Sequence, residues 1–436
     1  MPKSKGELPK LDPRSLPGPE TTFRDELDNG VVVLARQNSA SPSVVISGYL
    51  SVGSLDEPAE MAGLADMTAS ALMRGTQTRK FREIYESLES IGANLGISAG
   101  AHTTSFHGKS LAEDLPLLLE LLADVLRHPL FPKAQVEQLR AEKLTSLAIR
   151  DQDTRSQASM AFDDLVYPDH PYSQQTDGYP ETVSQLTPAN LRSFHRKRFG
   201  PRGMVISIVG AVEPKRTSRA VAKVLGGWSL PRQPARPELP PVTRLTGLAR
   251  KEVQLQGKSQ SDIVLGVVGP SRFEPDYLAA SLGNNILGRF GLMGRIGDSV
   301  RERSGLAYYA YSVVNGGPGP GPWQVVAGVN PANVQRAIDL VLEELRRFIT
   351  RRVTAQELFE NQSNYIGQLP LQLESNEGVA SALVHIERYQ LGLDYYQRYA
   401  SLIQAVTRGQ ILETARRFLD PDNLAIAVAG PMRARG

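Results

Sequence analysis

An internal repeat is the feature of this sequence that most constrains its fold. When the chain is displaced by 220 residues against itself, residues 186–210 align with residues 406–430 without a gap. Both copies have the same pattern: an amphipathic helix, a turn that contains proline, and an apolar strand that ends in glycine. The two strands are Met204–Val209 and Leu424–Ala429. This register predicts two copies of one domain; the alternative is two unrelated helix–strand units of similar composition.

Prolines mark the boundary between the two copies. Five of them lie within Trp228–Pro241, and backbone of this composition is extended and semi-rigid rather than helical. We therefore expect a linker at 229–244 between a first domain at 21–228 and a second domain at 245–436. Residues 1–20 are rich in Pro, Lys and Gly and are expected to form an extended N-terminal arm.

The order of strands and helices in the first copy predicts the fold class. Two strand-like runs, 22–26 and 31–36, flank Asp28–Gly30, whose Asp-Asn-Gly sequence is a strong hairpin turn signal. A further strand is expected at 43–52, and after two helices more strands are expected near 94–109. Strands segregated from long helices favour an antiparallel sheet. We predict an α+β chain of two repeated domains, each a largely antiparallel sheet with helices packed on one face.

Composition excludes several classes of function. The chain has no cysteine, which rules out disulfides, thiol catalysis and cysteine–zinc sites. Its formal net charge of +3 is spread along the chain without a basic stripe, so we expect no nucleic-acid partner. No apolar run of about 18 residues occurs, so we expect no membrane span. The N-terminus has no apolar signal core, which leaves a cytoplasmic location, or a periplasmic one if a signal peptide has been removed.

Short motifs occur in a fixed order along the chain. They are Asn29–Leu34, Gly63–Ala65, Gly75–Thr76, Asp169–Tyr172, Leu186–Pro188 and Gly305–Tyr308. In this order and at these distances the chain resembles the pitrilysin/insulinase family of inverzincin metallopeptidases, and in size the bacterial and mitochondrial-processing-peptidase branch. The resemblance covers nearly the whole chain past residue 20. It implies two similar domains per chain that enclose a peptide.

The resemblance makes Gly63–Thr76 the expected place of a zinc site. The family binds zinc with H-x-x-E-H on a helix, because two His at i and i+4 share one face and the Glu acts as general base on zinc-bound water. Here the positions of the first His, the Glu and the second His hold Asp66, Ala69 and Ser70. The family's third ligand is a Glu further along the chain, and the matching stretch Thr145–Ile149 has no carboxylate.

We therefore expect no metal in this chain. A shift of the alignment by a few residues brings in Glu142 or Asp151, but one carboxylate does not make a site. No two of the six histidines are spaced at i,i+3 or i,i+4, so the sequence gives no sign of a relocated metal centre.

A second family feature is retained in the second domain. The family carries an Arg–Tyr pair seven residues apart, and Arg301 and Tyr308 match that spacing, with Arg303 as an alternative arginine. A guanidinium and a phenol can hold a peptide carbonyl and the oxyanion that develops from it, and in the family they act across the cavity from the zinc. The structural alternative is an arginine that favours a helix C-terminus and a tyrosine that begins a half-buried strand.

Glycines at regular spacing precede this pair. Gly288, Gly291, Gly294 and Gly297 are predicted to contact substrate, because glycine lets the backbone approach a ligand. The alternative is close packing of helices. The segment is no phosphate loop, since it lacks the strand-then-GxGxxG order and the Gly-Lys-Ser ending.

The sequence thus predicts a non-catalytic subunit of a heterodimeric zinc metallopeptidase. It would contribute Arg301 and Tyr308 to peptide binding and transition-state stabilisation, while a homologous partner with the intact zinc motif carries the zinc. Two alternatives remain: an inert structural subunit similar to the core proteins of a respiratory complex, and a peptide-binding protein without a protease partner.

Overall fold

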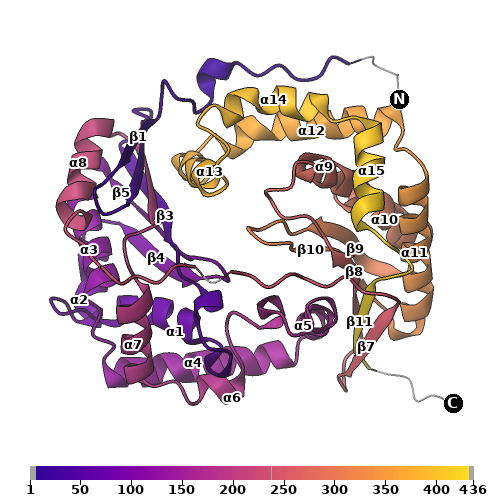
Figure 1. Cartoon of the computed structure of the whole chain (residues 1–436), viewed down its shortest axis with the longest axis horizontal. Helices are drawn as coiled ribbons and strands as arrows, with labels where there is room; N and C mark the ends of the chain where they lie inside the picture. The colour runs from indigo at the N-terminus through magenta and orange to yellow at the C-terminus, as the bar shows by residue number, and fades with distance from the viewer. Residues whose placement is uncertain (1–5, 237, 432–436) are drawn as a thin grey trace.

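The computed structural model describes residues 6–236 and 238–431, which form two halves with one β-sheet each (Figure 1). The N-terminal half has a six-stranded sheet in the order β1-β2-β6-β3-β5-β4. Its strands are β1 (Phe23–Glu26), β2 (Val32–Gln37), β3 (Ser43–Leu50), β4 (Asn94–Ala99), β5 (Thr104–Leu111) and β6 (Val205–Gly210). Its helices are α1 (Leu64–Ala71), α2 (Phe81–Glu89), α3 (Leu115–Arg127), α4 (Lys133–Asp151), α5 (Thr154–Val166), α6 (Pro180–Val183), α7 (Pro188–Arg198) and α8 (Pro214–Leu225).

The C-terminal half has a five-stranded sheet in the order β7-β11-β8-β10-β9. Its strands are β7 (Ala249–Gln254), β8 (Ser261–Val268), β9 (Ala307–Val314), β10 (Pro322–Val329) and β11 (Ala425–Gly430). Its helices are α9 (Tyr277–Gly288), α10 (Phe290–Ile296), α11 (Val334–Thr350), α12 (Ala355–Gln372), α13 (Asn376–Arg388), α14 (Tyr395–Ala405) and α15 (Arg408–Phe418). No helix in the described part of the chain is long and apolar enough to cross a membrane.

The last strand of each half occupies the equivalent place in its sheet, as the repeat predicts. β6 pairs parallel with β2 and antiparallel with β3, while β11 pairs parallel with β7 and antiparallel with β8. The preceding helices α7 and α15 are also capped alike, because the hydroxyl oxygens of Thr187 and Thr407 accept hydrogen bonds from backbone amides three residues on. The predicted equivalence of 204–209 and 424–429 is therefore confirmed.

Each half buries one face of its sheet against its own helices. In the N-terminal half this core joins Val33 and Ile46 of the sheet to Leu122 of α3. In the C-terminal half it joins Leu265 of β8 to Val341 of α11. The predicted fold class, two α+β domains with largely antiparallel sheets, is confirmed.

The second face of each sheet is covered by a helix from the other half (Figure 1). Helix α5, from the N-terminal half, packs on β7, β8 and β11, and α13, from the C-terminal half, packs on β3 and β6. Phe162 of α5 shares a buried cluster with Val264 and Ala427, and Leu383 of α13 shares one with Val45. The sequence analysis did not predict this exchange. The sequence signal was the nearly continuous run of apolar and small residues in β6 and β11. Every residue of these two strands is buried, which is typical of strands covered on both faces.

Two extended segments also connect the halves. The described part of 229–244 contains no helix or strand, and the Nε2 atom of His170 lies 3.1 Å from the carbonyl oxygen of Pro240. The N-terminal arm runs along α14 in Figure 1, where Leu16 is buried in one apolar cluster with Tyr396. The described part of the linker is extended, whereas the arm contains a short 3₁₀ helix at Pro13–Ser15.

Removing the side chain that anchors α13 is expected to destabilise the fold. Leu383→Ala deletes methyl groups that are completely buried between the two halves, so the free energy of unfolding should fall by about 2–5 kcal/mol. Leu371→Ala, at a position of α12 that is 71% exposed, is the matched control and should change it by less than about 0.5 kcal/mol. Denaturant titrations measure both values. An equally small effect of the two substitutions would contradict a structural role for the exchanged helix.

Candidate functional site

The degenerate zinc slot, defined as Asp66, Ala69 and Ser70, lies on α1 where this helix packs against α4. The spacing of the three residues puts them on one face of α1. The Asp66 Oδ2 atom lies 2.6 Å from the ammonium nitrogen of Lys143 on α4, and Ala69 is completely buried. A lysine ammonium therefore pairs with the residue at the first ligand position.

Other carboxylates near the slot have partners of their own. Glu57 accepts hydrogen bonds at 2.9 and 2.6 Å from two backbone amides at the start of α1, and burial raises its pKa to about 8. Glu142 on α4 pairs with Arg74 at 2.7 Å. Burial also raises the pKa of Asp66, against the lowering effect of the Lys143 charge. None of these groups is left free to complete a ligand set in the slot.

The residues of the slot do not fit a zinc ion. Zinc needs a tetrahedral set of Cys, His, Asp or Glu ligands, and the two His positions hold Asp66, which already pairs with Lys143, and Ser70. The methyl group of Ala69, at the position of the general base, can accept no proton. The Lys143 ammonium already neutralises Asp66 and would repel a second cation. Across residues 6–236 and 238–431, no group of three or more His, Cys, Asp and Glu side chains is placed to hold a metal. The slot provides neither a ligand set nor a general base.

Arg301 lies at the surface, in the π-helical turn Gly297–Arg303 that follows α10. Its side chain is 37% exposed, and its Nε atom lies 3.5 Å from a carboxylate oxygen of Glu302. Arg303, the alternative arginine, pairs more closely with Asp298, at 2.8 Å. Arg301 therefore has the looser ion pair of the two, while the Arg303 side chain is the more exposed, at 59%.

A β-bulge accounts for the exposure of Tyr308. On the edge strand β9, Ala307 pairs with Val329 and Tyr309 pairs with Gly328, so that Tyr308 has no partner residue on β10. A bulge re-aims the side chain of the extra residue away from the regular alternation of the strand. Tyr308 is 82% exposed, and its hydroxyl is accessible to a molecule outside this chain.

The four glycines predicted to contact substrate differ in their surroundings. A Cβ atom added to Gly288, Gly294 or Gly297 would clash with neighbouring atoms of the same segment or of β9. Gly291 has a φ of +62°, and a Cβ atom there would meet nothing within 4 Å. Close packing thus accounts for three of the glycines, whereas Gly291 faces open space and is the one whose backbone a ligand can reach.

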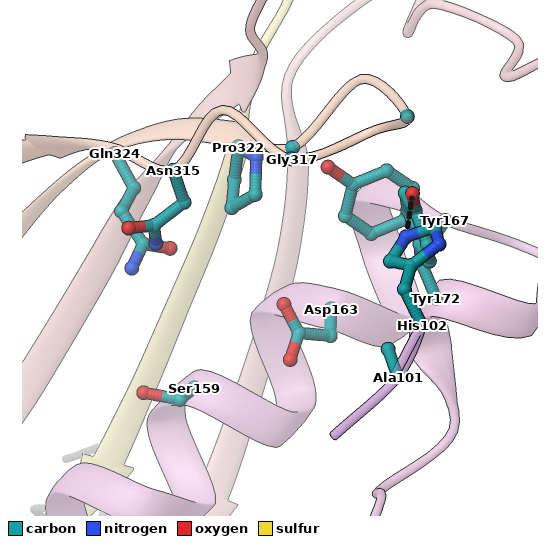
Figure 2. Close-up of a pocket in the computed structure, with 12 residues that line it drawn as sticks. Ala101, His102, Ser159, Asp163, Tyr167, Tyr172, Asn315, Gly317, Pro322 and Gln324 are labelled. Atoms are coloured by element: carbon teal, nitrogen blue, oxygen red, sulfur yellow. Dashed lines mark hydrogen bonds between the residues drawn. The ribbon is translucent and has the colours of Figure 1, made fainter. Parts of the chain in front are cut away.

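A cavity of about 340 Å³ lies between the two halves (Figure 2). It is lined by α5 and by residues near His102 from one half, and by the Gly- and Pro-rich loop 315–322 from the other. The Nε2 atom of His102 lies 2.7 Å from the Tyr172 hydroxyl, which joins two loops of the N-terminal half. The hydroxyl of Tyr167 donates to the carbonyl oxygen of Pro320 at 2.9 Å and so connects the halves at this cavity.

Asp163 is the titratable residue of this cavity that the sequence analysis missed. Figure 2 shows its carboxyl group turned from α5 toward the space under the loop. Burial raises the pKa of Asp163 to about 7, against a lowering hydrogen bond from Gln175. Burial likewise lowers the pKa of His102 to about 4. A single Asp on a helix gives no local signal; the Gly/Pro run Asn315–Pro322 is the feature that could have marked the place.

Two halves of one topology, with Asp66 and Ser70 on the helix where the family has its two His ligands, define a two-domain protein of the zinc-peptidase type. Residues 32–168 match the family model described as insulinase (peptidase family M16), and residues 185–365 match the model described as peptidase M16 inactive domain. The chain belongs to the M16 family of peptidases.

Relatives of known name or structure match either nearly the whole chain or a part of it. The chain is 28% identical over 434 residues to an uncharacterized zinc protease of Mycobacterium tuberculosis, covering 97% of this chain and 96% of that protein. It is 27% identical over 275 residues to the mitochondrial cytochrome b-c1 complex subunit 1 of Bos taurus, covering 61% and 56%. The crystal structure of a peptidase M16 inactive domain from Pseudomonas fluorescens superposes with a TM-score of 0.87 at 25% identity, covering 95% of this chain and 99% of that one.

The raised pKa of Asp163 predicts a pH-dependent effect of Asp163→Asn on stability. A carboxyl with a pKa near 7 in the folded chain and near 3.9 in the unfolded chain favours folding below the lower value, and this contribution is lost as the pH rises through 7. The neutral asparagine does not ionise, so the melting temperature of the variant relative to the unsubstituted chain should be higher at pH 8 than at pH 5.

Glu181→Gln is the matched control, because it removes a carboxylate from an exposed position of the same half. Its effect on the melting temperature should be the same at both pH values. A difference for Asp163→Asn that also does not change with pH would show that the Asp163 carboxyl is ionised in the folded chain throughout this range.

Proposed function

We propose that this chain is the non-catalytic subunit of a heterodimeric zinc peptidase. The observation that carries the proposal is a contrast between the two halves: an ion pair fills the zinc slot, while Arg301 and Tyr308 are accessible at the surface. A homologous partner chain would carry the H-x-x-E-H motif and the metal. The two chains would face each other across a bound peptide.

The role of this chain would be to hold the peptide carbonyl at the reacting centre. The phenol of Tyr308 and the guanidinium of Arg301 are directed donors, and negative charge develops on the carbonyl oxygen as the tetrahedral intermediate forms. Donors aimed at that oxygen stabilise the transition state more than the ground state, and losing one typically costs about 2.7–4 kcal/mol. The exposed bulge position of Tyr308 and the loose ion pair of Arg301 support this role.

A structural subunit is the second candidate, and the similarity to the cytochrome b-c1 complex subunit 1 favours it. Such a subunit needs neither accessible donors nor a peptide site. The two candidates therefore differ in what mutation of Arg301 and Tyr308 does to turnover. Mutation lowers peptide turnover if the chain is a peptidase subunit, and it has no effect on turnover if the chain is a structural subunit.

The isolated chain is expected to bind no zinc in the slot and to hydrolyse no peptide. The chain would be purified alone, dialysed mildly and analysed for metal, and then assayed on an unstructured peptide. Zinc near one equivalent that is lost in Asp66→Ala would contradict the assignment of the slot as inert, because it would require Asp66 to be a ligand rather than the partner of Lys143.

In a complex with the zinc-bearing partner, Tyr308→Phe should lower peptide hydrolysis by about 10²–10³-fold, the scale for one lost oxyanion donor. Arg301→Ala should do at least as much, and the double variant should be less than additive if both side chains hold the same oxygen. Hydrolysis rates, complex formation and melting temperature would be measured on each variant.

Two matched controls sharpen this comparison. Tyr85→Phe removes a hydroxyl from another exposed tyrosine, and Arg303→Ala removes the neighbouring arginine that already pairs with Asp298. Both should retain near-full activity. A larger loss for Arg303→Ala than for Arg301→Ala would transfer the role to Arg303. Full activity of both Tyr308→Phe and Arg301→Ala, with normal assembly, would end the case for a catalytic contribution from this chain.

A further inference from the structure

A polar cavity of about 680 Å³ lies in the C-terminal half, next to the exposed Gly291. Its walls come from the end of α9, the irregular turn that follows it, α12 and α14, elements that lie together in the upper right of Figure 1. The polar side chains that matter for what it can bind are Asn285, Arg289, Asn364, Tyr365, Gln368 and Tyr399. The guanidinium of Arg289 is the one charged group in the lining, which contains no carboxylate.

Arg289 differs from the arginines that follow it in the sequence. Arg295, Arg301 and Arg303 each pair with a carboxylate. Arg289 is exposed and pairs with no carboxylate in the described part of the chain, and its positive charge acts on the buried phenol of Tyr365. A guanidinium at the mouth of a cavity without a counter-charge favours an anion with two oxygens, because its N–H groups match a carboxylate in pairs.

Hydrogen bonds within the chain hold the cavity wall in place and leave some N–H donors of the wall without a partner among the described residues. The Tyr365 hydroxyl donates a hydrogen bond to the carbonyl oxygen of Ser281 at 3.0 Å, which holds the ring in place. The Gln368 side chain donates from Nε2 to Asn364 Oδ1 at 3.0 Å, which uses the acceptor of Asn364 and leaves its amide N–H groups for a ligand. The wall is therefore prearranged and rich in donors beside the arginine.

We infer that this cavity binds a carboxylate of a peptide that lies along the Gly291 turn. The inference rests on the proposed function, since it assigns part of the peptide's contacts to this chain. The carboxylate can come from the C-terminus of the peptide or from an Asp or Glu side chain, and both present the same two oxygens to Arg289. At Gly291 the missing side chain lets the peptide backbone approach the turn directly.

The test is a binding measurement with the full chain alone and three fluorescent peptides of one neutral sequence. The first has a free C-terminal carboxylate, the second is C-terminally amidated, and the third is amidated and carries one internal Glu. The first peptide or the third should bind more tightly than the second, and which of them does so identifies the source of the carboxylate. Arg289→Gln should remove this preference, a loss of about 10–100-fold, the scale of one charged hydrogen-bonded contact.

Two further variants separate charge from structure. Arg289→Lys keeps the charge and should retain part of the preference, while Arg352→Gln, at an exposed arginine of the same half, should leave it unchanged. Equal affinity for all three peptides, no binding of any, or an unchanged preference in Arg289→Gln would overturn the inference. These outcomes do not touch the proposed function, whose test is the turnover of Tyr308→Phe in the complex.

Discussion

The exchange of helices α5 and α13 is the constraint on which the rest of this structure depends. Each sheet is apolar on both faces, and its own helices cover only one of them. An uncovered second face would expose the continuous apolar surface of β6 or β11 to water, at a cost proportional to the area. Each half therefore needs a helix from the other, and neither sheet can complete its burial alone. The exchange holds the zinc slot of one half and the Arg301–Tyr308 segment of the other in one framework.

Within that framework, the Asp66–Lys143 pair shows how a metal position can be lost without loss of the fold. A partly buried carboxylate at the first ligand position requires a counter-charge, because an unpaired one is costly. Lysine supplies a single charge from the facing helix and keeps α1 and α4 together. Ala69 fills the former base position with a completely buried methyl group. Where the family has two ligands and a base, this chain has an ion pair at Asp66 and a packed methyl group at Ala69.

Sequence repeats and short motifs predicted the features that depend on residues close together in the chain. The equivalence of β6 and β11 followed from a gapless repeat, and the positions of Asp66, Ala69 and Ser70 on one helix followed from the intact motif frame around them. The exchanged helices α5 and α13 did not follow, because the local sequence of a helix does not show against which sheet it packs. Lys143 was missed for a different reason. The search at Thr145–Ile149 was for a carboxylate ligand, whereas Asp66 pairs with a cation that lies two residues before that stretch.

Pairing register decided the remaining features, and register is a property of two strands or segments rather than of one. The exposure of Tyr308 depends on how β9 meets β10 at the bulge, and the alternation of β9 alone does not reveal it. The same holds for the glycines: spacing treats Gly288, Gly291, Gly294 and Gly297 alike, and only the packing of the turn against its surroundings distinguishes Gly291.

Arg289, Gly291, Arg301 and Tyr308 lie within residues 289–308, between α9 and the start of β9. That stretch combines left-handed glycines, a π-helical turn and a bulge, each of which interrupts regular backbone hydrogen bonding and turns groups outward. Helix α1 of the N-terminal half, which carries the degenerate zinc slot, is regular, and its Asp66 is held in an ion pair. Irregular backbone is maintained only where the surrounding structure supports it, and here α11 and α12 hold Arg295 in the middle of the stretch through Glu344 and Glu357. The C-terminal half thus leaves Arg301 and Tyr308 accessible in an irregular stretch, while in the N-terminal half an ion pair and packing fill the slot on α1.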